Sequence, residues 1–207
     1  YSIECAKACP WIDEVFVSTE DEEIYRVAQE LGAIVINRPL ELSTDTASEW
    51  LAWQHAINWV YQEYGKFDQF ISLPTTSPLR SVSDIESAIK QRIKVKADAC
   101  ISVSPSSRSP FFNMIQYDEL GLVSLVNSSR SDVKRRQDAP TVYDITTVVY
   151  VLTPQFILNN QGLFDGKVTA IEVPKERAVD IDDIMDFKFA ELLLKESLVE
   201  ESINDDG

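Results

Sequence analysis

Residues 70–103 read FISLPTTSPLRSVSDIESAIKQRIKVKADACISV, and this stretch points to the fold class. An apolar run at 70–73 enters a proline-bounded loop. A helical pattern follows at 82–94, with Ser83 as its expected cap, and a second apolar run lies at 100–103. A strand, a helix and a strand in this order indicate a βαβ unit. Short, continuous apolar runs also indicate a sheet that is covered on both faces.

The same alternation continues on both sides of this unit. Toward the N-terminus we expect helices at 1–8, 20–31 (capped by Thr19) and 47–64, and strands at 14–18 and 33–36. Toward the C-terminus we expect strands at 147–151 and 168–173 and helices at 154–160 and 184–200. The predicted fold is therefore α/β, with a mostly parallel sheet flanked by helices.

Residues 105–143 interrupt this pattern. They show no clean period, and they contain the basic run RSDVKRRQ at 130–137. We expect a small two-stranded arm here. The α/β domain would then comprise residues 1–104 and 144–207.

Composition narrows the classes of partner. Hydrophobic residues make up 44% of the 207 residues, which is enough for a sizeable core. The 19 basic and 34 acidic residues give a net charge of −15, which argues against nucleic acid or an anionic membrane as a partner. No apolar run reaches membrane-spanning length. Three cysteines without metal-type or CxxC spacing predict a reducing, cytoplasmic compartment.

Polar residues follow several predicted strands. In α/β sheets, ligands bind beyond the carboxyl ends of the strands. Residues 18–20, Arg38 and residues 74–80 occupy such positions and are rich in hydroxyls and arginine, which suits a phosphorylated ligand. Arg38 could equally be an exposed, salt-bridging arginine. The hydroxyls around Ser77 fit a base or sugar pocket, although loop architecture alone explains the prolines beside them.

Asp180 and Asp182 are separated by one apolar residue. On an extended segment both carboxylates point to the same side, and their repulsion favours a hard cation such as Mg²⁺. An acidic turn in which Asp183 caps the following helix is the simpler interpretation. The chain has one histidine, His55, which argues against histidine-based hydrolase triads, and it has no GxGxxG or Walker lysine loop.

Five motifs in order resemble one family. They are VSTED at 17–21, RPxxLxxDTAS at 38–48, TSPLR at 76–80, RRQxxP at 135–140 and VDID at 179–182. Together they span nearly the whole chain and resemble the acylneuraminate cytidylyltransferases, also called CMP-sialic acid synthetases. This family is related to the CMP-Kdo synthetases.

The resemblance implies a Rossmann-like nucleotidyltransferase fold and a homodimer formed through the arm. Such enzymes convert CTP and a 2-keto sugar acid into a CMP-sugar and pyrophosphate. The resemblance assigns catalysis and Mg²⁺ binding to Asp180 and Asp182. It assigns nucleotide binding to Arg38, Asp45, Thr46 and Ser48, and sugar binding to Thr75, Thr76, Ser77, Arg136, Gln137, Tyr150 and Phe164. Arg136 and Gln137 would reach the sugar from the neighbouring subunit.

Three departures from the family pattern qualify this prediction. The family's first strand and its phosphate-binding loop are absent, so we expect that they precede Tyr1. Pro74 replaces a glutamine that often contacts the sugar, and Tyr143-Asp144-Ile145-Thr146-Thr147-Val148 replaces Tyr-x-x-Asn-Gly-Ala. Since the last two changes fall on the sugar side, we predict retained CTP chemistry with a sugar acid other than N-acetylneuraminate. A CMP-Kdo-type synthetase, another nucleotidyltransferase and a non-catalytic nucleotide-binding relative are the alternatives.

Overall fold

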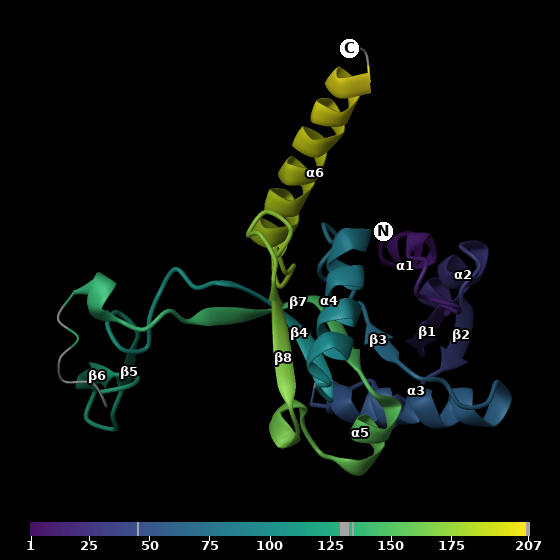
Figure 1. The fold of residues 1–207 in the computed structure, drawn as a ribbon, viewed down its shortest axis with the longest axis horizontal. Coiled ribbons are helices and arrows are strands. Elements are labelled where there is room, and N and C mark those ends of the chain that lie inside the picture. The colour runs from purple at the N-terminus through teal and green to yellow at the C-terminus, as the bar shows by residue number, and fades with distance from the viewer. Residues whose placement is uncertain (45, 129–132, 134, 206–207) are drawn as a thin grey trace.

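The computed structural model describes residues 1–44, 46–128, 133 and 135–205, with the backbone alone for 198–205. Helices and strands alternate along the chain, as predicted (Figure 1). The helices are α1 Ser2–Ala8, α2 Glu22–Glu30, α3 Glu49–Glu63, α4 Val82–Val95, α5 Pro154–Asn159 and α6 Ile184–Asp205. The strands are β1 Phe16–Thr19, β2 Ile34–Asn37, β3 Phe70–Ser72, β4 Ala99–Pro105, β5 Ile115–Tyr117, β6 Val123–Leu125, β7 Tyr143–Leu152 and β8 Val168–Glu172. Short 3₁₀ turns lie at Leu40–Leu42, Arg136–Asp138 and Leu163–Asp165.

The central sheet has four strands in the order β3-β7-β4-β8. Strand β7 runs antiparallel to both β3 and β4, whereas β8 is parallel to β4. Strands β3, β4 and β8 therefore point in one direction, and β7 alone opposes them. Strands β1 and β2 form a separate parallel pair. Strand β7 is longer than the predicted 147–151 because its first residues pair with the end of β4.

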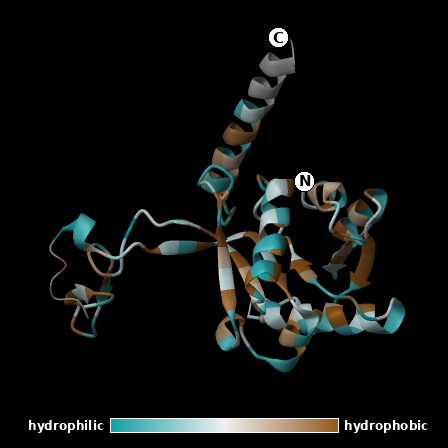
Figure 2. Ribbon diagram, viewed as in Figure 1, coloured by the Kyte–Doolittle hydropathy of each residue, from teal (hydrophilic) through white to brown (hydrophobic). Residues whose placement is uncertain are grey.

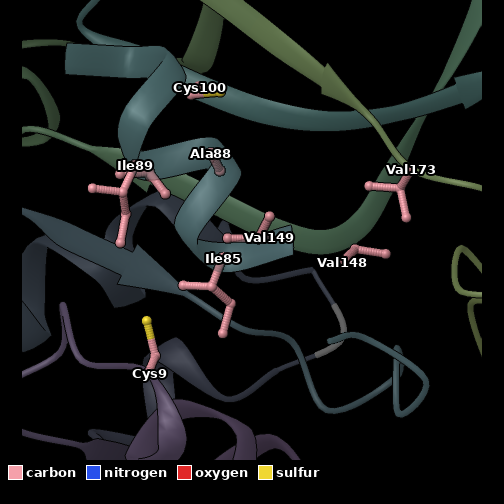
Figure 3. Packing of buried hydrophobic residues seen from close by; sticks show 9 residues of the cluster. Cys9, Ile85, Ala88, Ile89, Cys100, Val148, Val149 and Val173 are labelled. Carbon is pink, nitrogen blue, oxygen red and sulfur yellow. The ribbon is translucent and has the colours of Figure 1, made fainter. Parts of the chain in front are cut away.

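Both faces of the central sheet are buried, as the continuous apolar runs predicted. Successive side chains of a strand point to opposite faces. Accordingly, Cys100 and Val151 belong to a cluster with Ile85 and Ile89 of α4 (Figure 3). Their neighbours Ala99 and Leu152 belong to a second cluster, with the aromatic residues of α3 and α5. Helix α4 thus covers one face and α3 with α5 the other.

Two helix caps differ from the prediction. Ser81, not Ser83, caps α4, because Ser81 and Asp84 form a reciprocal capping box. Asp21, not Thr19, caps α2, and its carboxylate accepts the amides of Glu23 and Ile24. In both cases the predicted cap, a hydroxyl residue, lies two residues from the observed one.

Two parts project from this body (Figure 1). Strands β5 and β6 pair antiparallel, as predicted for a two-stranded arm, and they lie apart from the central sheet. Helix α6 extends away beyond the end of β8, and Figure 2 shows both apolar and polar residues in its turns nearest to β8. No helix in the described ranges has the length and hydrophobicity that crossing a membrane requires.

Candidate active site

The candidate site lies at one edge of the central sheet. Because β3, β4 and β8 share a direction, their carboxyl ends meet at this edge. The loop after β3, the arm after β4 and the segment after β8 all start there. This is where ligands bind in open α/β sheets.

The loop after β3 is bonded to the segment that carries the aspartates. The amide of Ile181 donates to the carbonyl oxygen of Thr76 at 2.9 Å. The hydroxyl of Ser77 lies 3.2 Å from the carbonyl oxygen of Val179 and 2.6 Å from Oγ1 of Thr147 on β7. Ser77 is fully buried, so its hydroxyl joins three segments of the chain. Thr75 and Thr76 are exposed beside it.

The acidic segment divides its carboxylates between two roles. Asp183 caps α6, since its Oδ1 accepts the amides of Met185 at 2.6 Å and Asp186 at 3.0 Å. The simpler interpretation of the segment therefore holds for Asp183. Asp180 differs, because its Oδ1 is buried and has no hydrogen-bond partner. A buried carboxylate oxygen without a donor is costly, and a cation would satisfy it. Asp182 is exposed.

Tyr150 connects this segment to helix α3. Burial, followed by the charges of Glu49 and Asp180, raises the pKa of the Tyr150 phenol. Tyr150 thus lies near both Asp180 and Glu49, and Glu49 is in the first turn of α3, where Ser48 is the cap residue. The Tyr150 ring lies 5.6 Å from the ring of Trp53. Leu163 packs against the same aromatic cluster, whereas the adjacent Phe164 is 69% exposed.

Arg38 lies at the end of the β1–β2 pair. Its amide donates to the carbonyl oxygen of Thr19, and its guanidinium donates two bonds, of 3.0 Å and 2.8 Å, to Oε2 of Glu20. Hydrogen bonds from Ser43 and Arg38 hold the pKa of Glu20 below its usual range. The exposed salt bridge considered for Arg38 is therefore present, and the arginine remains accessible.

The other residues that the resemblance assigns to the nucleotide make fewer contacts than Arg38. Thr46 and Ser48 are exposed, and the Ser48 hydroxyl makes no capping hydrogen bond. Asp45 lies outside the described residues. In the described part of the chain, no hydrogen bond joins Arg38, Thr46 or the Ser48 side chain to the loop after β3.

The residues expected at the sugar carboxylate lie at the base of the arm. Arg136 and Gln137 line a depression of about 270 Å³, together with Arg108. Nη2 of Arg136 donates to the carbonyl oxygen of Ser107 at 2.9 Å, and Nζ of Lys175 donates to Oγ of Ser107 at the same distance. Since Lys175 follows β8, the base of the arm adjoins the start of the segment that leads from β8 to Asp180. Residues 130–132 and 134 of the basic run lie outside the described residues.

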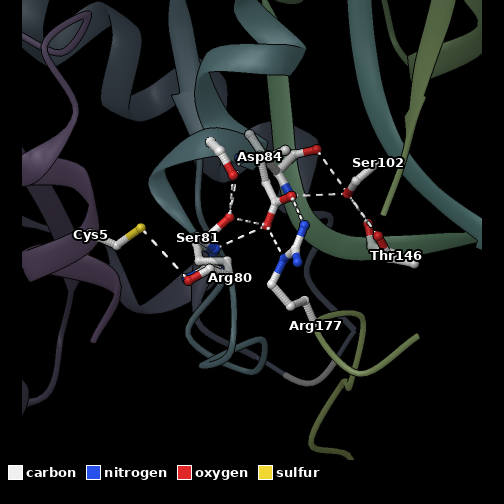
Figure 4. A network of polar contacts seen from close by, with 9 residues as sticks. Cys5, Arg80, Ser81, Asp84, Ser102, Thr146 and Arg177 are labelled. Atoms are coloured by element: carbon white, nitrogen blue, oxygen red, sulfur yellow. Dashed lines mark hydrogen bonds and ion pairs between the residues drawn. The ribbon is translucent and has the colours of Figure 1, made fainter. Parts of the chain in front are cut away.

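Sequence reasoning missed an ion pair that anchors the acidic segment (Figure 4). Arg177 donates two bonds, of 3.0 Å and 2.9 Å, to the carboxylate of Asp84 at the start of α4. Burial opposes ionisation of Asp84, but the hydrogen bonds from Arg177 and Ser81 outweigh it, so the pKa of Asp84 is lowered. The local sequence contains no signal for this pair, since its members are 93 residues apart.

An α/β sheet with arginine, hydroxyl and carboxylate side chains on the loops at its edge is the arrangement in which α/β proteins bind phosphorylated ligands. A protein-family model described as Cytidylyltransferase matches residues 1–145. The chain therefore belongs to the cytidylyltransferase family, whose members are CTP-dependent nucleotidyltransferases.

Relatives of known name agree with this assignment. The chain is 33% identical over 200 residues to post-translational flagellin modification protein B of Campylobacter coli, covering 95% of this chain and 83% of that protein. It is 30% identical over 197 residues to the CMP-N,N'-diacetyllegionaminic acid synthase of Campylobacter jejuni, covering 94% and 82%. It is 28% identical over 190 residues to the N-acylneuraminate cytidylyltransferase of Escherichia coli, covering 92% of this chain but 44% of that protein.

A solved structure supports the fold. The synthetase of CMP:2-keto-3-deoxy-manno-octonic acid, complexed with CTP, superimposes with a TM-score of 0.66. The match covers 94% of this chain and 86% of that one at 14% sequence identity. The Rossmann-like nucleotidyltransferase fold predicted from the motifs is thereby confirmed.

Proposed function

We propose that this chain transfers the cytidylyl group of CTP to a 2-keto sugar acid of the nonulosonate class. The anomeric hydroxyl oxygen forms a bond to the α-phosphorus, the bond from that phosphorus to the bridging oxygen breaks, and pyrophosphate and a proton leave. The observation that carries the proposal is the junction of three segments at the sheet edge. Ser77 and Thr76 hold the segment of Asp180, whose Oδ1 is buried and unpartnered.

The residues at this edge suit that reaction. Phosphoryl transfer requires positioning and charge neutralisation more than covalent catalysis. Arg38 donates two bonds to Glu20, and its other guanidinium N–H groups would meet a phosphate on the nucleotide side. Arg136 and Gln137 would receive the sugar carboxylate in the depression at the base of the arm. Both anions would then be bound by arginine, which reduces their mutual repulsion.

We propose that Asp180 and Asp182 hold Mg²⁺. The unpartnered Oδ1 of Asp180 supports this, because a carboxylate oxygen buried without a donor fits a hard cation that prefers oxygen ligands. When bound, Mg²⁺ supplies charge neutralisation at phosphate oxygens. Among the described residues, no group of three or more His, Cys, Asp or Glu side chains could hold a metal ion. The two aspartates would therefore need water and substrate oxygens as further ligands, as Mg²⁺ commonly does.

The sugar is proposed to differ from N-acetylneuraminate. Pro74 stands where many family members have a glutamine, and its carbonyl oxygen accepts a bond from buried Arg80. Thr146 stands where they have an asparagine, and its hydroxyl donates to Ser102 inside the sheet. Neither position offers an amide to the sugar. Two relatives are named for a legionaminic acid and for N-acylneuraminate, and these sugar acids are therefore among the nonulosonates to be tested.

We propose that two copies of the chain associate through the arm. The β5–β6 hairpin exposes large apolar side chains that a monomer would leave in water: Ile115, Tyr117, Leu120, Leu122 and Val123 are 53–84% exposed. Because the arm begins and ends at the sheet edge, a second copy seated on it would also adjoin the depression at its base. We further propose a reducing, cytoplasmic location, since Cys5, Cys9 and Cys100 are free thiols.

The deciding experiment is a substrate panel. Each of the four nucleoside triphosphates is combined with legionaminic, pseudaminic, N-acetylneuraminic and Kdo-type acids, and pyrophosphate release is measured with and without Mg²⁺. We expect release with CTP and a nonulosonate, and less with N-acetylneuraminate. Preference for Kdo or for another nucleotide would reassign the substrate, and no release with any pair would favour the non-catalytic alternative.

The metal assignment has its own variants. Asp180→Asn and Asp182→Asn should each reduce turnover about 100-fold or more, since charge neutralisation by a metal ion is worth several kcal/mol. Asp183→Asn is the matched control, because asparagine caps a helix as well as aspartate does. Full activity in both Asp180→Asn and Asp182→Asn would remove the metal from these residues.

A further inference from the structure

Strand β7 contains a bulge of three residues beside the candidate site. Its partner β4 pairs Ile101 with Tyr150, but the next residue, Ser102, pairs with Thr146. Residues 147–149 of β7 are therefore inserted into the ladder. The peptide groups of a bulge lose their partners across the sheet, and buried peptide groups require new ones.

Two buried side chains supply these partners. From β4, Oγ of Ser102 accepts the amide of Val149 at 3.0 Å and lies 3.1 Å from the carbonyl oxygen of Thr146. From the loop after β3, Nε of Arg80 donates to the carbonyl oxygen of Val148 at 2.7 Å, and Nη2 donates to that of Thr147 at 3.3 Å. The bulge is thus held from both sides.

Arg80 is an unusual residue for this position. It is 6% exposed, and no salt bridge of the described residues includes it, although the charge of Asp84 acts on it from further away. Its remaining bonds go to the carbonyl oxygen of Pro74 and the hydroxyl of Ser2. Burial lowers the pKa of Arg80 to about 10, so it stays charged at neutral pH. A buried charge without an ion partner is costly, and an apolar residue could fill the same space.

Three hydrogen bonds lead from Arg80 through Thr147 and Ser77 to Val179, the residue before Asp180. Arg80 joins the loop residue Pro74 to the bulge carbonyl oxygens. Thr147 of the bulge then contacts Ser77, which contacts the carbonyl oxygen of Val179. The Thr76 carbonyl oxygen accepts the amide of Ile181. The two peptide groups that flank Asp180 are therefore both held by the loop that Arg80 anchors.

We propose that Arg80 is a positioning residue for the carboxylate of Asp180. Its hydrogen bonds join the bulge of β7 to the loop 74–80. Thr76 and Ser77 of that loop bind the segment 179–181 and so fix its orientation. The inference rests on the proposed function, in which Asp180 and Asp182 hold a divalent cation. Arg80 itself touches neither the cation nor the substrate.

The test compares Arg80 with a matched arginine on the same helix–loop unit. Arg92 is half-buried near the other end of α4, where it donates to Oε1 of Gln69 at 3.0 Å and to the carbonyl oxygen of Ala97 at 3.3 Å. Lysine and methionine variants are made at both positions. Two quantities are measured: the Mg²⁺ concentration for half-maximal pyrophosphate release, and amide hydrogen exchange in peptides covering 177–183.

We expect Arg80→Met to raise the half-saturating Mg²⁺ concentration about 10- to 100-fold, the usual effect of removing a group that orients a metal ligand. Exchange in 177–183 should become faster. Arg80→Lys keeps the charge and part of the bonding, so both effects should be smaller. The Arg92 variants should lower thermal stability without changing either quantity.

Several results would overturn the inference. If the Arg80 variants behave like the Arg92 variants, Arg80 is a structural residue only. If the wild-type chain releases no pyrophosphate, the proposed function fails, and the exchange data still decide whether Arg80 orients the segment. If no Arg80 variant folds, native-state hydrogen exchange on the wild-type chain tests the inference instead. The amides of Val149, in the bulge, and of Ile181, beside Asp180, should then exchange with the same opening free energy. Unequal opening free energies would show that the bulge and the segment 179–181 are not coupled.

Discussion

Replacing Arg177 with methionine removes the bidentate partner of a buried carboxylate. Asp84 is 4% exposed and accepts both bonds of the fork, at 3.0 Å and 2.9 Å. Breaking a buried ion pair on one side costs roughly 3–5 kcal/mol in general. Here the cost is reduced, because the Arg177 side chain is about a third exposed and Asp84 keeps its bonds from Ser81. We expect a loss of about 2 kcal/mol in unfolding free energy.

The assay is urea unfolding followed by circular dichroism at fixed protein concentration. For a chain of this size, a loss of about 2 kcal/mol corresponds to a melting temperature lower by roughly 4–8 °C. The matched control is Arg135→Met, which removes an ion pair of the same 2.9 Å length, with Asp138, at the surface. The unfolding midpoint of that variant should not change measurably.

The effect of Arg177→Met should depend on pH in a defined direction. The pKa of Asp84 is lowered in the folded chain, so its stabilising contribution is present above the unfolded pKa. That contribution is lost as the pH falls through the folded pKa, because the protonated carboxyl no longer attracts the guanidinium. The difference in unfolding free energy between the wild type and Arg177→Met should therefore be largest at pH 7 and decrease below about pH 4. A difference that increases in acid would refute this reasoning, and so would an equal loss of unfolding free energy in Arg177→Met and Arg135→Met.

Three further outcomes are expected. Leu122→Lys on the arm should shift sedimentation from dimer to monomer, whereas Leu51→Lys on α3 should leave it unchanged; two identical profiles would contradict the arm interface. Arg38→Met should raise the KM for CTP about tenfold or more while kcat changes less, and an unchanged KM would remove Arg38 from the nucleotide site. Gly166→Ala should cost about 1–3 kcal/mol, because a Cβ there would lie 2.5 Å from a Phe156 ring carbon, and Gly162→Ala, which meets only ordinary contacts, should melt like wild type.

The amino-acid sequence alone was sufficient for the α/β class and the order of helices and strands, but not for the antiparallel direction of β7 or the separate β1–β2 pair. Apolar runs such as 70–73 and 100–103 became β3 and β4, and the helical pattern between them became α4. Burial of both sheet faces followed from the same runs, since alternate side chains of a continuous apolar strand must both leave water. The cytidylyltransferase family followed from the order of five short motifs, because motifs record which residue types a ligand requires. These are local properties of the chain.

Tertiary structure decided how the site is held together. Ser102 is a polar residue inside the apolar strand β4, and its buried hydroxyl requires a partner. The partners of Ser102 lie 44 and 47 residues away, those of Arg80 as far as 78, and the partner of Arg177 lies 93 residues away. Hydrogen bonds and ion pairs over such separations depend on which strands become neighbours and on the bulge in β7. Local propensity carries no information about either, and the supports of Asp180 were therefore visible only in the folded chain.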